Sequence, residues 1–367
     1  MFGVDRAEVW VRVDADVELI ALGIQKKFPG VASSGKKDKT GSYSYTFKIE
    51  QENINQIKVK DKIYCRKVGV DFSYPRGIRK TNLYPLDDEV EKLLVEEKIV
   101  QVVREITLEQ EVDRKNFIYS LLEICIQEEI KGFYKYNNLI NFFYKALIRK
   151  FNNPLMEQSQ FNNYDQVTDR FYQTGFTFLG ERGWKIRLYS KLHEHNKKHK
   201  EKEKSALLRL EHQLTTNRIN NIFKTTKIAE LPLEVLKEEI SKKIGLLLFE
   251  LLKDEISRSE IILEKHLKNF NSRDLKGLIK DLQEWILDEK IIGYIIQQNS
   301  SKSDRQKGRY RAMVKESLEE SQTRASPRRD NFNNLERLEL FINKFLLVKC
   351  EVKAKYTEHL TFRLLKT

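Results

Sequence analysis

The stretch that decides the fold prediction is 174–214, TGFTFLGERGWKIRLYSKLHEHNKKHKEKEKSALLRLEHQL. It predicts three strands, at 176–179, 184–189 and 206–214, because apolar and polar residues alternate there. The turn at 180–183 has a glycine at each end, as a tight hairpin needs. Since neighbouring side chains on a strand point to opposite faces, one face of this meander is predicted to be apolar and the other polar.

The polar face of this predicted meander has the groups that phosphoryl transfer uses. A tyrosine hydroxyl is a nucleophile, carboxylates hold hard divalent metal ions, and cations hold phosphate. The bland alternative is an amphipathic sheet with a solvated outer face, which is common in antiparallel sheets. The pattern leaves both open. The residues that share the polar face are Lys185, Arg187 and Tyr189 on the second strand and Arg209, Glu211 and Gln213 on the third.

The same stretch resembles the core of the filamentous-phage gene II/X replication initiators and the related rolling-circle plasmid initiators. Their pattern is a basic strand that ends in Tyr-x-Lys with a glutamate soon after. A charged loop and a strand with Arg-x-Glu follow. The matching positions in this chain are Tyr189, Lys191, Glu194, Leu208, Arg209, Leu210 and Glu211.

This resemblance implies a DNA endonuclease that nicks and rejoins one strand of an origin through a phosphotyrosine intermediate. The implied nucleophile is Tyr189, with Lys191 and Arg209 as catalytic cations. The implied ligands of Mg²⁺ or Mn²⁺ are Glu211, Glu194 and Glu105, the last as the acid on a preceding strand. The implied DNA contacts near the hairpin are Arg182, Lys185 and Arg187. The pair His193 and His195 is predicted to lie in a strand-exit turn.

The partner that the resemblance implies is DNA, as a single-stranded or cruciform origin of a plasmid, a phage or an integrated element. Host helicase, host polymerase and a second copy of the chain are further expected partners, in the cytoplasm of a bacterial host. Two other classes stay open, namely a non-catalytic DNA-binding regulator and an RNA-binding or scaffold protein.

Composition supports a polyanionic partner. The 367 residues include 67 Lys and Arg against 54 Asp and Glu, a net charge of +13, which favours nucleic acid over membrane. A Lys/Glu-rich surface is the alternative explanation. Cys65, Cys125 and Cys350 are odd in number and far apart, which predicts a reducing compartment and neither a disulfide framework nor a zinc site. No apolar run approaches membrane-spanning length and the N-terminus is polar, so no transmembrane segment or signal peptide is predicted.

The whole chain predicts an α+β protein. An antiparallel-sheet, nuclease-like core with packed helices is expected at 1–225, and a mainly helical domain at 226–367. No internal repeat is visible in the sequence. Further strands are predicted at 6–14, 43–49, 57–72 and 99–108, helices at 17–28, 87–98, 113–130 and 139–151, and irregular segments at 33–41, 74–85 and 154–173.

The C-terminal part is predicted to be helical and to end in a hairpin. A helical subdomain with a two-stranded wing is similar to a winged helix, which predicts binding to duplex DNA. A helical support with solvated loops is the alternative. Phosphate contacts are predicted in a polar loop, at Arg324, Arg328 and Arg329. Predicted helices lie at 233–256, 259–268, 272–289, 309–320 and 335–345, and predicted strands at 346–355 and 360–365.

Overall fold

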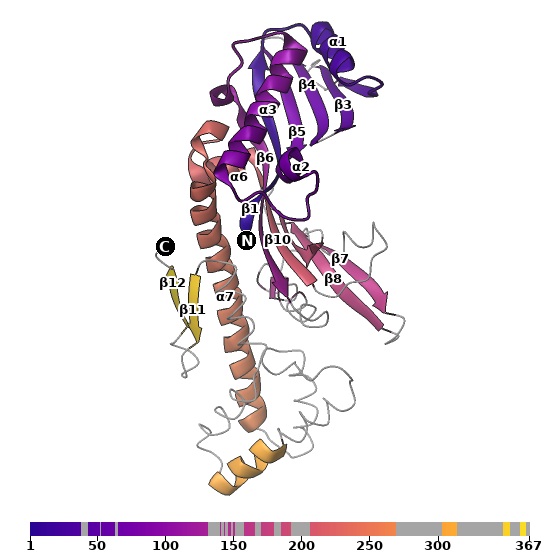
Figure 1. Cartoon of the computed structure of the whole chain (residues 1–367). Coiled ribbons are helices and arrows are strands. Elements are labelled where there is room, and N and C mark those ends of the chain that lie inside the picture. The colour runs from indigo at the N-terminus through magenta and orange to yellow at the C-terminus, as the bar shows by residue number, and fades with distance from the viewer. Residues whose placement is uncertain are drawn as a thin grey trace. The chain divides into compact units, whose positions relative to one another are not determined.

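The structure is a computed structural model, and its main feature is one large antiparallel sheet. Its ten strands lie in the order β2-β3-β4-β5-β1-β6-β10-β9-β8-β7 (Figure 1). The strands are β1 Phe2–Val13, β2 Ser33–Lys37, β3 Tyr43–Gln51, β4 Ile54–Lys62, β5 Cys65–Ser73, β6 Ile118–Ile130, β7 Gln158–Asp165, β8 Arg170–Leu179, β9 Lys185–Ser190 and β10 Ala206–Thr215. The residues described are 1–37, 43–51, 53–62, 65–130, 140, 143, 146–147, 150, 158–165, 170–179, 185–191, 206–268, 303–313, 348–352 and 360–364.

Helices lie between and after the strands of this antiparallel sheet, so the α+β prediction is confirmed. They include α1 Val17–Lys27, α2 Tyr74–Arg79, α3 Glu89–Thr107, α6 Thr216–Phe223 and α7 Leu233–Lys268, with short 3-10 turns η1 Arg114–Asn116 and η3 Ile228–Glu230. Residues 304–313 are helical as well (Figure 1). A separate hairpin joins β11 Val348–Val352 to β12 Leu360–Leu364. This hairpin was predicted, whereas the helical part of the proposed winged helix falls largely outside the described residues. None of the described helices is long and apolar enough to span a membrane.

The two faces of the sheet differ in chemistry because each strand alternates. On β1, Ala7, Val9 and Val11 are buried on one face, while Arg6 and Glu8 lie on the other. Burying a side chain such as valine stabilises the fold by roughly 1.5–3 kcal/mol. The apolar face is covered by α1 and α3, which lie side by side over β1 and its neighbours.

Contacts at Glu96 place α3 on that apolar face. The Glu96 carboxylate accepts hydrogen bonds from the hydroxyls of Tyr74 (2.8 Å) and Tyr119 (3.1 Å). Tyr119 is the cross-strand partner of Val9, so it shares the apolar face. Lys92 and Arg114 pair with the same carboxylate, at 3.0 and 2.5 Å. A buried carboxylate needs such partners, since an unpaired buried charge is costly.

The predicted strand at 99–108 is wrong, because these residues complete α3. Val95, Ile99, Val103 and Ile106 are all buried at helical spacing on one side of it. Packing of that stripe on the sheet overrides the β-propensity of the segment. Asp88 caps the helix start by accepting a hydrogen bond from the Glu91 backbone N–H at 2.9 Å.

The predicted helix at 113–130 is also wrong, because most of it forms β6. Leu122, Ile124 and Ile126 alternate with Glu123 and Gln127, which is the strand period. Two segments predicted to be irregular are strands instead, β2 within 33–41 and β7 with the start of β8 within 154–173. The helices predicted at 233–256 and 259–268 are one helix, α7. The predicted linker 74–85 begins with α2.

The topology is repeated, although the sequence shows no repeat. The first half runs β1-α1-β2-β3-β4-β5 and lies in the sheet as β2-β3-β4-β5-β1. The second half runs from β6 to β10 and lies as β6-β10-β9-β8-β7, the mirror order. After β6 the described positions 140, 143, 146, 147 and 150 are helical, as predicted for 139–151 and as α1 is after β1. The antiparallel pair β1–β6 joins the halves.

Two compact units divide the chain. The first comprises 1–129, 156–160 and 175–240, and the second 130–155, 161–174 and 241–367. The first unit holds β1–β5, β9, β10 and nearly all of β6, with α1, α2, α3 and α6. In the second, Lys150 pairs with Glu250 at 2.9 Å and Asp254 at 3.1 Å. The predicted functional division at 225/226 stays a prediction.

Candidate functional site

The polar face predicted for 174–214 is present on β9 and β10. Arg209 is the cross-strand partner of Tyr189, and Glu211 is the partner of Arg187. Direct partners in an antiparallel pair point to the same face, so these four side chains share one side of the sheet. The predicted pairing of the two motifs across neighbouring strands is confirmed. Trp184 and the turn 180–183 lie outside the described residues.

Glu211 is the centre of this cluster. Its Oε1 accepts a hydrogen bond from the Tyr189 hydroxyl at 2.5 Å. Its Oε2 accepts one from Arg187 Nη1 at 3.2 Å. The Glu211 side chain is buried, whereas that of Arg187 is 32% exposed. The three groups can serve three chemical roles in one place. The phenol of Tyr189 can act as a nucleophile, the carboxylate of Glu211 can accept its proton, and the guanidinium of Arg187 can bind phosphate.

Two cations, Arg187 and Lys191, lie near the Tyr189 ring. The guanidinium carbon of Arg187 lies 5.3 Å from the ring centroid, and Lys191 Nζ lies 5.8 Å from it. Tyr189 and Lys191 are both buried, with relative exposures of 7% and 5%. Of the cations beside Tyr189, Arg187 is therefore the most accessible to a ligand phosphate.

Arg209 is fully buried and is held by internal contacts. Its Nε donates to Gln127 Oε1 at 2.6 Å, and its Nη1 donates to Asp5 Oδ2 at 3.1 Å. Its Nη2 donates to the backbone carbonyls of Asn82 at 3.1 Å and Leu83 at 2.7 Å. Arg209 thus lies beside Tyr189, as predicted, but its donors are engaged by the protein, which fits a positioning role.

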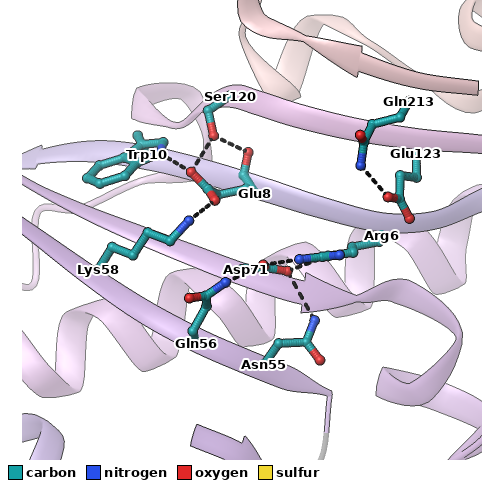
Figure 2. Close-up of polar contacts among 10 residues, drawn as sticks. All are labelled: Arg6, Glu8, Trp10, Asn55, Gln56, Lys58, Asp71, Ser120, Glu123 and Gln213. Atoms are coloured by element: carbon teal, nitrogen blue, oxygen red, sulfur yellow. Dashed lines mark hydrogen bonds and ion pairs between the residues drawn. The ribbon is translucent and has the colours of Figure 1, made fainter. Parts of the chain in front are cut away.

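The polar face continues across the sheet beyond the cluster (Figure 2). Arg6 on β1 binds the buried Asp71 on β5, with Nε to Oδ1 at 2.8 Å. Asn55 and Gln56 also donate to Asp71, each at 3.0 Å. Burial alone would raise the pKa of Asp71, but the hydrogen bonds from Arg6, Gln56 and Asn55 outweigh it and lower the pKa.

A second carboxylate of this face, that of Glu8 on β1, is also held by hydrogen bonds and an ion pair. It pairs with Lys58 and accepts hydrogen bonds from the Trp10 indole at 2.7 Å and the Ser120 hydroxyl at 2.8 Å. Burial would raise the pKa of Glu8, yet the bonds from Lys58, Trp10 and Ser120 lower it. Both carboxylates of this half of the face are therefore charged and compensated.

Glu123 on β6 is the functional candidate that sequence reasoning missed. It is the partner of Arg6 in the β1–β6 register and accepts a hydrogen bond from Gln213 Nε2 at 2.5 Å. Burial, and next the charge of Glu211, raise the pKa of Glu123 to about 7. The signal that could have found it is the alternation of Leu122, Ile124 and Ile126 with Glu123 and Gln127.

The raised pKa of Glu123 makes stability depend on pH. The folded state holds this proton more tightly than the unfolded chain, so the contribution is full below the ordinary glutamate pKa and is lost as pH rises through about 7. We expect Glu123→Gln to be more stable than the natural chain at pH 8.5 by roughly 3 kcal/mol, since each pKa unit corresponds to about 1.4 kcal/mol, and equal to it near pH 4. Urea unfolding in metal-free buffer at both pH values checks this. An equal effect at both pH values would contradict it.

One predicted metal ligand, Glu105, lies apart from Glu211. Glu105 lies on α3 and pairs with Lys27 of α1, on the helix-covered side of the sheet away from Glu211. An acid that the structure does bring near Glu211 is Glu123. It lies on β6, which is the neighbour of β10 in the sheet, whereas residues 99–108 belong to α3. The other predicted positions Glu194, Arg182, Arg324, Arg328 and Arg329 lie outside the described residues.

The implied divalent metal can be tested against these donors. No set of three or more His, Cys, Asp or Glu that could hold a metal ion occurs within the described ranges. The pair Glu211 and Glu123 does fit part of such a site, since the charge of Glu211 raises the pKa of Glu123 and a bound cation would offset that repulsion. Mg²⁺ is commonly held by one or two carboxylates and completed by water and substrate phosphate.

No family model and no curated protein matches this chain. Among solved structures, it is similar to the rolling circle replication initiator protein from Geobacillus stearothermophilus, with 16% identity and a TM-score of 0.34 over 66% of this chain and 83% of that one. It is also similar to the di-domain ARO/CYC StfQ from the steffimycin biosynthetic pathway, with 11% identity and a TM-score of 0.18 over 61% and 89%. Both TM-scores are below 0.5.

Proposed function

We propose that this chain is a rolling-circle replication initiator that nicks and rejoins one strand of an origin through Tyr189. The observation that carries the proposal is the 2.5 Å hydrogen bond from the Tyr189 hydroxyl to Glu211, with Arg187 at the same carboxylate. A nucleophile in contact with a carboxylate that can accept its proton is the arrangement that covalent catalysis requires. The net charge of +13 favours a polyanionic substrate.

The proposed step transfers one phosphoryl group. Tyr189 Oη attacks the scissile phosphorus, and its proton passes to the Glu211 carboxylate. The bond from phosphorus to one deoxyribose oxygen breaks, and that oxygen takes a proton from water. The products are a tyrosine phosphodiester and a free DNA hydroxyl. Rejoining is the reverse, in which a deoxyribose hydroxyl attacks the phosphotyrosine and Tyr189 recovers its proton.

The surrounding residues have separate roles in this proposal. Arg187, the exposed cation of the cluster, binds the scissile phosphate and offsets its charge. Lys191 adds positive charge beside the Tyr189 ring. Arg209 positions β10 by binding Asp5, Gln127 and the 82–83 carbonyls. When bound at Glu211 and Glu123, Mg²⁺ or Mn²⁺ would polarise the phosphoryl oxygens.

The test of this proposal is the covalent adduct. The natural chain, incubated with end-labelled single-stranded DNA of a candidate origin and Mn²⁺, is expected to yield a labelled protein band on a denaturing gel. A non-catalytic DNA-binding regulator, the alternative, would bind the same DNA and give no adduct. Absence of adduct with every strand and fragment of the plasmid or phage that encodes the chain would contradict the proposal.

Glu211→Gln should slow the reaction without preventing DNA binding. The amide keeps the size of the side chain and can still accept from Tyr189, but it cannot take a proton and is a weaker metal ligand. We expect the rate of adduct formation to fall by about 10²–10⁴-fold, since general base catalysis contributes that much. Single-turnover adduct formation measures the rate, and fluorescence anisotropy measures binding. A rate equal to that of the natural chain would show that Glu211 does not accept the proton.

A further inference from the structure

We propose that the face of β1–β5 opposite α1 and α3 is a second DNA-binding surface, which holds the phosphate backbone away from Tyr189. One line of direct cross-strand partners carries the argument: Lys36 on β2 faces Ser44 on β3, Ser44 faces Lys60 on β4, Lys60 faces Lys67 on β5, and Lys67 faces Arg12 on β1. We call Lys36, Lys60, Lys67 and Arg12 the basic row. With strands about 4.8 Å apart, it spans about 19 Å, the length of several nucleotides.

The basic row is on the polar face and accessible. Its neighbours on each strand, such as Val59, Val68 and Val11, are buried on the helix-covered face. Lys36, Lys60 and Arg12 are exposed and Lys67 is half-exposed. No ion pair joins any of the row to another residue in the described part of the chain. Lys60 lies over the Trp10 ring, 4.3 Å from its centroid, so its amine is held at the sheet surface.

Repulsion between the like charges of the row destabilises the fold, and a bound anion would remove this repulsion. Lys60 faces Lys67, and Lys67 faces Arg12, and like charges placed directly opposite each other on a sheet are destabilising. Two carboxylates on the same face, Glu8 and Asp71, are already paired with Lys58 and Arg6. Since no ion pair in the described residues involves the row, it is a line of positive charge without a bound partner charge. A chain of regularly spaced phosphates is the ligand that fits it, and its counterions are released on binding.

The repeated topology gives an independent reason to separate binding from cleavage. Ser73 precedes α2 directly, and Thr215 precedes α6 directly. Counted back from these residues, Gly69 corresponds to Glu211 and Lys67 to Arg209. Their partners Lys58 and Lys60 correspond to Arg187 and Tyr189. The first half thus has lysine where the second has the nucleophile, and glycine where it has the acceptor carboxylate.

Trp10 fills the place that this glycine leaves. A Cβ atom added at Gly69 would lie 2.5 Å from the Trp10 ring, so the indole packs flat against the backbone there. The same indole donates to Glu8 and carries Lys60 above it. The position in the first half that corresponds to the Tyr189–Glu211 cluster therefore holds the cation of Lys60 at the surface. It has neither a tyrosine nucleophile nor a carboxylate to accept a proton.

The test compares two variants with the same loss of charge. Lys60→Gln, Lys67→Gln and Arg12→Gln together remove the centre of the row. Lys26→Gln, Lys98→Gln and Lys115→Gln together form the control, on α1, α3 and η1. The probe is a fluorescein-labelled, single-stranded oligonucleotide of mixed sequence, with anisotropy measured over a range of salt. We expect the row variant to bind at least about 10-fold more weakly in low salt, with a salt slope smaller by about 2, and the control to change little.

Other outcomes would overturn the proposal. Equal losses in both variants would mean that net charge alone matters, and no loss in the row variant would exclude DNA from this face. Loss of binding to phosphatidylserine vesicles with unchanged DNA binding would assign the row to lipid instead. The melting temperature of the row variant should not fall, because repulsion between like charges is removed. A variant with Lys60→Arg and Lys67→Arg keeps the charges and should bind DNA as the natural chain does.

The proposal shares its DNA ligand with the proposed function. Tyr189→Phe separates the two, because it removes the adduct and leaves the row intact.

Discussion

Tyr189→Phe is expected to abolish strand cleavage and the covalent DNA adduct while DNA binding persists. The change removes only the hydroxyl, and in the described part of the chain no other hydroxyl donates to Glu211. We expect the cleavage rate to fall by about 10⁴-fold or more, as when other enzymes lose their nucleophile. Binding through Arg187 and the basic row should survive, because neither depends on the phenol oxygen.

The variant should fold, with a modest loss of stability. Removing a hydrogen bond to a charged group costs about 1.5–3 kcal/mol, and Glu211 keeps its bond from Arg187. Tyr43→Phe, on the exposed surface of β3, is the matched control and should cleave normally. The readout is adduct on a denaturing gel beside anisotropy for binding. Adduct formed by Tyr189→Phe would identify a different nucleophile, and Tyr164 and Tyr172 would be tested next.

Arg209→Met is expected to cause the largest loss of stability. It removes a buried cation and leaves the Asp5 carboxylate, the Gln127 amide oxygen and the carbonyls of Asn82 and Leu83 without its donors. Breaking a buried ion pair by removing one partner costs about 3–5 kcal/mol. Urea unfolding should show this loss directly, or the variant should be recovered unfolded.

A second arginine on the same face provides the comparison for Arg209. Arg187→Met also removes a cation paired with Glu211, but that side chain is 32% exposed. Pairs that solvent screens contribute about 0–1 kcal/mol, so its unfolding curve should move little. The double variant Arg209→Met with Asp5→Asn should recover part of the loss, because it also removes the buried charge that Arg209 compensates. Equal unfolding curves for the two arginine variants would contradict the role given to Arg209.

The sequence was sufficient to predict strands, and the faces of their side chains, where apolar and polar residues alternate clearly over a short stretch. The faces of β9 and β10, and the placement of Tyr189 and Glu211 on the same face, follow from strand alternation. It failed at 99–108 and 113–130, where apolar residues satisfy both helical and strand spacing and tertiary packing decides. Misplacing β6 hid Glu123, and treating 33–41 as a loop hid the basic row, because a row across strands exists only after their register is known. The roles of Arg209 and Asp5 also depended on burial, which spacing does not reveal.

The position of β6 has a consequence for synthesis of the chain. One edge of β6 pairs with β1, which precedes it, but the other edge pairs with β10. The Gln127–Arg209 contact between them spans 82 residues. While the ribosome adds these residues, at roughly 5–20 per second, the growing chain carries an apolar strand with an unpaired edge for seconds. Such an edge is a template for aggregation. Chaperone demand should therefore be greatest after β6 has emerged and before β10 has.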